Sequence, residues 1–152
     1  MSYNRILIYW SPVILWMGFI FWMSSGTFSS DNTSSIIKPF LLFLFPRISP
    51  QEIDMVHGII RKCGHVGEYF ILGLLLFRAF RAGSNESRMR RWTSSAFLVV
   101  LLYAASDELH QSFVATRTAS FFDIAIDAVG GVLAQGVSAL RQCRHKKQPP
   151  NF

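Results

Sequence analysis

The sequence predicts an all-α integral membrane protein in which four transmembrane helices form one bundle. Of its 152 residues, 51% are hydrophobic and 14% are aromatic, which is more apolar than a soluble domain of this size usually is. The apolar residues fall into separate runs, and Lys and Arg gather between alternate runs. We therefore expect one membrane domain over residues 1–140 and a basic cytoplasmic tail over residues 141–152.

Four segments are predicted to cross the membrane. Only the first apolar run, Ile6–Met23, approaches the ~20 residues that a transmembrane helix needs. The other three runs become long enough once neighbouring polar residues join the helix. The resulting spans are about 6–24, 59–81, 93–112 and 121–140. Polar groups then lie at membrane depth, where a charge costs ~2.5–3.5 kcal/mol, so we expect them to face each other or a wet cavity.

The first span has an alternative interpretation as a secretory signal. Arg5 precedes it, and the small residues Ser24-Ser25-Gly26 follow it. The run is nevertheless bulkier than the usual core of a signal, because it contains Trp10, Trp16 and Trp22. We interpret it as a retained span.

An outer interfacial segment is predicted between spans one and two. Residues 24–35 are rich in Ser and Thr and are predicted to form a loop. The run Ile36–Phe45 is too short to cross a bilayer, which favours an interfacial or re-entrant segment. Ser49-Pro50-Gln51-Glu52 is typical of a helix start. We expect the amphipathic helix that begins there to enter span two, with a kink at Gly58 or Gly64.

The basic residues orient the protein in the membrane. With four spans, both termini and the loop Ala82–Trp92 lie on one side, together with ten of the fifteen Lys and Arg residues. The positive-inside rule therefore predicts cytoplasmic N- and C-termini. We expect the basic loop and tail to contact anionic lipid of the inner leaflet, and we do not expect nucleic acid as a partner.

Ionisable residues concentrate at the outer ends of spans two, three and four. Span two enters the membrane at this face, span three leaves there and span four enters there, so their polar ends share one depth. Asp107 and Gln111 are four residues apart, as are Asp123 and Asp127, so each pair lies on one helical face. The residues that could surround a single site are Lys62, His65, Glu68, Asp107, Glu108, His110, Gln111, Arg117, Asp123 and Asp127, and Tyr69 shares a helical face with Lys62 and His65.

A purely structural interpretation of these residues stays open. Lys62 and Arg117 could each neutralise a carboxylate, and Ser120-Phe121-Phe122-Asp123 is typical of a helix start, which would explain Asp123 as a cap. Asp127 lies one turn deeper and is harder to explain in this way. Further along span four, small residues favour close helix packing: Gly130, Gly131, Ala134 and Gly136.

Three other kinds of site are disfavoured by the sequence. His and Glu residues in spans two and three could ligate zinc or manganese, but there is no His-Glu-x-x-His motif, so no metal site is predicted. Ser106 or Ser112 could act as a nucleophile beside His110, although serines are common in membrane helices. A transporter would need polar residues near the midplane, and the inner halves of the spans offer only Gln135. The sequence indicates no particular cofactor.

Polar motifs follow one another along spans two to four: Arg61-Lys62-x-x-His65-x-x-Glu68-Tyr69-x-x-Leu72-Gly73, then Ser106-Asp107-Glu108-x-His110-Gln111-x-Phe113, Arg117, and Asp123-x-x-x-Asp127-x-x-Gly130. With these motifs, residues 1–140 resemble the VanZ-like family, which is named for a teicoplanin-resistance membrane protein. The resemblance implies a small multi-pass protein of the bacterial plasma membrane and, for the founding member, low-level teicoplanin resistance, but no established reaction. At Ala115-Thr116-Arg117 the family often has Pro-Gly-Arg, so this turn differs while Arg117 is kept.

The leading hypothesis is an outward-facing polar site that binds or modifies the head group of an envelope lipid or of a lipid-linked cell-wall precursor. The resemblance carries the polar motif of the family over to Lys62, His65, Glu68, Asp107, Glu108, Gln111, Arg117, Asp123 and Asp127. The candidates for proton transfer and catalysis are His65, Glu68, Asp107, Glu108 and Asp127. The candidates for substrate binding are Lys62, Tyr69, His110, Gln111, Arg117 and Asp123, with Lys62 and Arg117 as phosphate ligands. The alternatives are a non-catalytic accessory protein and the structural network.

Overall fold

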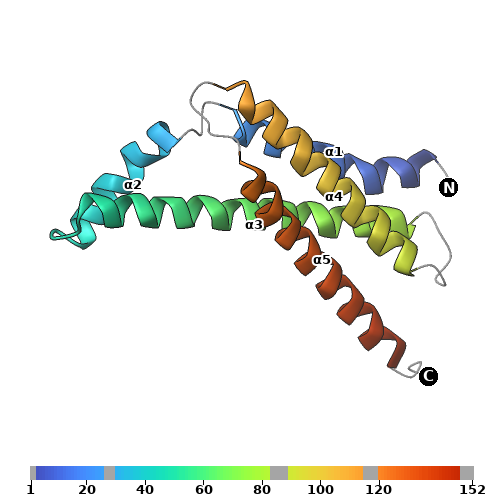
Figure 1. The fold of residues 1–152 in the computed structure, drawn as a ribbon. Coiled ribbons are helices and arrows are strands. Elements are labelled where there is room, and N and C mark those ends of the chain that lie inside the picture. The colour runs from blue at the N-terminus through green and yellow to red at the C-terminus, as the bar shows by residue number, and fades with distance from the viewer. Residues whose placement is uncertain (1–2, 26–29, 83–88, 115–119, 148–152) are drawn as a thin grey trace.

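The computed structural model describes residues 3–25, 30–82, 89–114 and 120–147, and these residues form five α-helices (Figure 1). The helices are α1 (Tyr3–Met23), α2 (Ser30–Leu44), α3 (Pro50–Ala82), α4 (Met89–Ser112) and α5 (Phe121–Lys147). None of the described residues forms a strand. The all-α prediction is therefore confirmed.

Three helices of the described chain are long and apolar enough to cross a membrane. These segments are Asn4–Met23, Pro50–Ala82 and Phe121–Cys143. They correspond to α1, α3 and α5, which supports a membrane protein. The 24 residues of α4 give a helix of ~36 Å, which exceeds the ~30 Å of a hydrocarbon core. Its charged ends make α4 less apolar than the other three, so a fourth span stays a prediction.

The longest helix, α3, is the one against which the others pack. Its largest interface is with α5, and it also contacts α1, α2 and α4. In Figure 1, α1 and α4 lie over the second half of α3, whereas α2 folds back over its first half. The end of α1, the end of α4 and the start of α5 meet near the middle of α3. Three helix termini are thereby brought to one level of the bundle.

Two predictions about the segment before span two are corrected. The region expected to be a loop up to residue 35 already becomes helical at Ser30, where α2 begins. The kink expected at Gly58 or Gly64 does not occur, because α3 is one continuous helix of 33 residues that runs straight in Figure 1. At its start, the Glu52 carboxylate accepts hydrogen bonds from the Ser49 backbone N–H and hydroxyl, both at 2.8 Å, as the predicted capping box requires.

Small residues of α5 allow close contact with α3 and α4. A Cβ atom at Gly130 would lie 2.4 Å from the Val66 carbonyl oxygen, and one at Gly131 would lie 2.8 Å from a methyl carbon of Val100. The predicted close packing is confirmed at both positions. Gly136 has no such neighbour within 4 Å, so its small size serves no contact between the described helices.

The exterior of the helices is apolar, whereas much of the interior is polar. Large side chains such as Leu15 and Leu102 are exposed on α1 and α4. Continuous exposed apolar surface of this kind is typical of contact with lipid. Among the described residues, in contrast, ten polar or charged residues are buried, and six of them form the two clusters described next.

Candidate functional site

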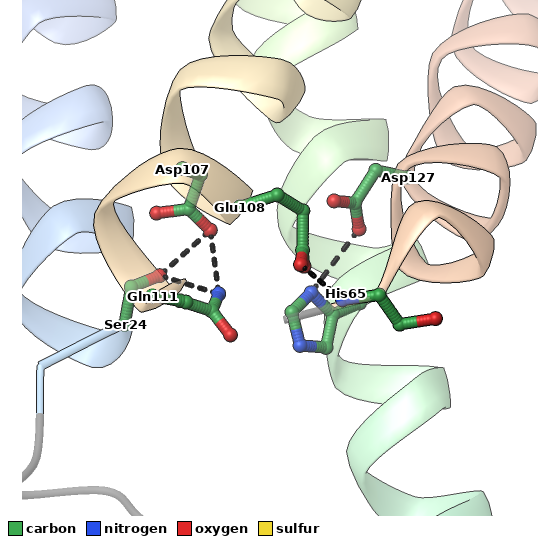
Figure 2. Close-up of polar contacts among 7 residues, drawn as sticks. Ser24, His65, Asp107, Glu108, Gln111 and Asp127 are labelled. Carbon is green, nitrogen blue, oxygen red and sulfur yellow. Dashed lines mark hydrogen bonds and ion pairs between the residues drawn. The ribbon is translucent and has the colours of Figure 1, made fainter. Parts of the chain in front are cut away.

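Two polar clusters lie where the helix ends meet (Figure 2). The His65 cluster consists of His65 from α3, Glu108 from α4 and Asp127 from α5. The Asp107 cluster consists of Ser24 at the end of α1, with Asp107 and Gln111 from α4. The single site expected from the sequence is thus divided between two neighbouring groups of residues.

The His65 cluster is built around a buried imidazole and carboxylate. The distance from His65 Nδ1 to Asp127 Oδ1 is 3.1 Å, and the exposed fractions of the two residues are 8% and 0%. A carboxylate at Nδ1 orients the ring and stabilises its protonated form, which leaves Nε2 as the nitrogen able to exchange a proton. Figure 2 shows Nε2 on the ring edge turned away from Asp127. The pair therefore has the geometry of an oriented general base.

Glu108 connects this cluster to the start of α5. One of its oxygens, Oε2, accepts a hydrogen bond of 2.8 Å from the Ser120 backbone N–H. The Ser120 hydroxyl accepts a hydrogen bond of 3.2 Å from the Phe122 N–H, so Ser120 caps the helix. In a complete capping box Asp123 would bind the Ser120 N–H, and here Glu108 occupies that place. The buried Asp123 carboxylate is thus left in the first turn of α5, one turn before Asp127.

The Asp107 cluster joins α1 to α4. Asp107 Oδ2 accepts a hydrogen bond of 2.8 Å from the Ser24 hydroxyl and one of 3.0 Å from Gln111 Nε2. The bond between Asp107 and Gln111 confirms that they share a helical face, as their spacing predicts. Asp107 and Glu108 are adjacent in sequence and therefore point about 100° apart on α4, toward α1 and α5 respectively. This divergence is the physical reason for the two clusters.

The remaining predicted residues lie around these clusters or outside the described chain. Tyr69 is fully buried, one turn beyond His65 on α3. The Glu68 backbone carbonyl accepts a hydrogen bond of 2.9 Å from Trp16 Nε1, and its side chain is half-buried. Lys62 is exposed on α3. His110 stacks against Phe21, with ring centroids 4.4 Å apart, and Arg117 lies outside the described residues.

Four buried oxygens at this level lack a hydrogen-bond partner within the described chain. They are Tyr69 Oη, Asp107 Oδ1, Glu108 Oε1 and Asp127 Oδ2. A buried polar atom left unpaired costs ~1–3 kcal/mol. Two further unpaired oxygens of the described residues, Gln135 Oε1 and Gln142 Oε1, lie further along α5, so most of these atoms are concentrated at the level of the clusters. Among the described residues, no group of three or more His, Cys, Asp and Glu side chains is arranged to hold a metal ion.

A surface cavity of about 670 Å³ lies at the turn between α2 and α3. Its lining consists of Leu44, Phe45, Pro46, Arg47, Ile48, Glu52, Met55 and Val56. None of these residues belongs to either cluster. The lining is mostly apolar, and its one carboxylate, Glu52, is held by the Ser49 backbone N–H and hydroxyl in the capping box of α3.

Sequence reasoning missed two groups that complete the clusters. The sequence predicts that Ser24 lies in an exposed loop. For Ser120 it predicts a helix start, but nothing in the sequence indicates which residue binds its backbone N–H. Both depend on partners far along the chain, Asp107 and Glu108. The small residues after span one gave the only signal for Ser24.

Comparison with known proteins gives one match. Residues 9–142 match the family model described as VanZ/LLP1. No curated protein and no solved structure matches the chain. The matched range includes every residue of both clusters.

Proposed function

Since the chain belongs to the VanZ/LLP1 family, we propose that its polar site faces outward and binds or modifies the head group of an envelope lipid or of a lipid-linked cell-wall precursor. The observation that carries this proposal is the buried pair of His65 and Asp127, with Glu108 beside it, inside helices whose exterior is apolar. Ionisable groups in such surroundings are costly and are generally kept for function. Family membership also supports a contribution to glycopeptide resistance of the teicoplanin type.

The proposal includes four spans in the bacterial plasma membrane with cytoplasmic termini. Three candidate spans and a fourth helix of sufficient length support it. In Figure 1 the start of α1 and the end of α5 lie at the same end of the bundle, away from the point where the end of α1, the end of α4 and the start of α5 meet, as an even number of spans requires. In this orientation the clusters open to the outside. The basic loop and tail then contact anionic lipid of the inner leaflet.

Proton transfer is the chemistry that the His65 cluster supports. In a modifying reaction, His65 Nε2 would take a proton from a hydroxyl or amine of the ligand, and Asp127 would stabilise the resulting imidazolium. Glu68 and Glu108 are further acids near this end of the helices. Lys62 and Arg117 are proposed to hold phosphate outside the cluster.

The test is a comparison of membrane lipids and lipid-linked precursors by mass spectrometry. Extracts are taken from a deletion strain and from strains complemented with the wild type, Asp127→Asn or, as a control, Asp54→Asn, which changes an exposed acid of α3. We expect the wild type and Asp54→Asn to restore a head group that the deletion strain and Asp127→Asn lack. Identical lipids in all four strains would exclude modification.

A non-catalytic accessory role is the second candidate, and the Asp107 cluster favours it. Its three side chains bind one another across α1 and α4, which is what a structural network requires. In this case Asp127→Asn would weaken antibiotic resistance without any change in the lipids. If each variant lost resistance only in proportion to its loss of protein abundance, the polar clusters would have a purely structural role.

A further inference from the structure

We propose that the His65 cluster recognises a primary ammonium group on its ligand. This inference rests on the proposed function and specifies the chemistry of the head group. Glu108 Oε1 and Asp127 Oδ2 are two buried carboxylate oxygens that have no hydrogen-bond partner among the described residues. Figure 2 shows both side chains extending, from α4 and α5, toward the space above the His65 ring. The cluster thus offers unused acceptors on two helices.

The acidic side chains of the His65 cluster favour a positively charged ligand. Two buried carboxyl groups face one imidazole, so with both acids ionised even a protonated His65 leaves an excess of negative charge. Asp123, buried one turn before Asp127, adds to this excess. Buried charges are stable only when they are paired and hydrogen bonded. A phosphate inside the cluster would be repelled by the same acids, so the anionic part of a head group would lie outside it.

Bonds within the cluster do not satisfy these oxygens. A proton shared by the two acids would require a hydrogen bond between Glu108 Oε1 and Asp127 Oδ2, and neither atom has a partner in the described part of the chain. The Tyr69 hydroxyl, one turn deeper on α3, is buried and has no partner among the described residues either. Three unpaired oxygens therefore come from α3, α4 and α5.

An ammonium group matches this set of atoms. It carries a positive charge and three N–H donors, and ionised carboxylates only accept hydrogen bonds. A trimethylammonium group carries the same charge but no N–H donor, so it would leave the oxygens unpaired. The inferred ligand class is a membrane lipid or lipid-linked precursor that bears a primary amine.

The experiment measures which lipids stay bound to the full-length protein. The protein is reconstituted in nanodiscs of equal parts phosphatidylethanolamine, phosphatidylcholine and phosphatidylglycerol, then extracted in detergent, and its bound phospholipids are quantified by mass spectrometry. We expect enrichment of phosphatidylethanolamine over phosphatidylcholine. Asp127→Asn and Glu108→Gln should each lower this enrichment about tenfold, because a hydrogen bond to a charged acceptor is weakened. Asp54→Asn should leave it unchanged, because Asp54 is exposed.

A third variant and a competition measurement separate the possible outcomes of this experiment. Tyr69→Phe removes only a hydroxyl and should reduce the enrichment even if an acid variant fails to fold, which thermal unfolding would reveal. Once phosphatidylethanolamine is found to be enriched, free ethanolamine is added as a competitor. It should displace the bound lipid if the protein recognises the amine alone, and it should not displace the lipid if recognition also needs the acyl chains or the phosphate. Equal retention of all three lipids, reduced by Asp127→Asn, would overturn the ammonium inference and leave the proposed function. Retention that no cluster variant changes would overturn both.

Discussion

His65 and Asp127 are 62 residues apart in the chain, yet Nδ1 of one lies 3.1 Å from Oδ1 of the other in the buried interface of α3 and α5. Neither group is stable alone in this interface, because a buried polar group without a partner pays its full cost of desolvation. Each side chain therefore stabilises the position of the other. The same contact fixes the register between the two helices that share the largest interface.

Asp127→Ala should destabilise the protein more than Asp127→Asn does. Alanine leaves His65 Nδ1 buried without a partner, which should lower the free energy of unfolding by ~1–3 kcal/mol. Asparagine retains an amide oxygen at the place of Oδ1, so its cost should be smaller, whereas the charge needed for proton transfer is lost. Thermal unfolding of the purified variants in detergent measures this order. Equal destabilisation by both variants would mean that the negative charge, and not the hydrogen bond, holds the contact.

Gly130→Ala should disrupt the packing of α5 on α3. The added Cβ would meet the Val66 carbonyl oxygen at 2.4 Å and the Phe70 backbone nitrogen at 2.9 Å, and backbone atoms of a helix cannot move aside cheaply. Overpacking of this kind costs ~1–3 kcal/mol. Gly136→Ala is the matched control, because its Cβ meets nothing within 4 Å, and it should be neutral or stabilise the helix by up to ~1 kcal/mol. A lowered melting temperature for both variants, or for neither, would contradict the packing in the structure.

The fold and the shared depth of the polar residues could be predicted, because both follow from patterns along the chain. Apolar run lengths and helix starts indicated α3 and α5 close to their observed positions. The alternation of spans then placed Asp107 and Asp127 at one level without any knowledge of packing. The spacing of Asp107 and Gln111 predicted that they share a helical face, and in the structure they are joined by a hydrogen bond.

The partition into two clusters could not be predicted, because it depends on how α4 is rotated against its neighbours. Asp107 and Glu108 were equally good candidates for one site, and only the packed bundle directs them toward α1 and α5. Ser24 illustrates the same limit, since its partner is 83 residues away. For α4, the sequence predicted a helix correctly, but the charges near its ends keep it from being one of the three helices that are apolar enough to cross a membrane.

Ser24→Ala should loosen the attachment of α1 to α4. It removes the donor of the 2.8 Å bond to Asp107 and leaves that buried carboxylate with Gln111 as its bonded neighbour. We expect a loss of ~1.5–3 kcal/mol, the range for a hydrogen bond to a charged group. Ser106→Ala is the control, because the exposed Ser106 hydroxyl bonds only to the Tyr103 carbonyl within its own helix. A double-mutant cycle with Gln111→Ala should show coupling of at least ~0.5 kcal/mol, and strict additivity would mean that the three residues do not act as one network.

Cysteine labelling should reveal the orientation of the bundle. Cys63 and Cys143 are both free and exposed, and they lie near opposite ends of the predicted bundle, at the start of span two and beyond the end of span four. With cytoplasmic termini, a membrane-impermeant maleimide should label Cys63 in intact cells and should reach Cys143 only after the membrane is permeabilised. Cys63→Ser and Cys143→Ser variants assign each signal to one residue. Labelling of Cys143 in intact cells would reverse the orientation and turn the His65 cluster toward the cytoplasm, where a site for outer-leaflet lipid could not operate.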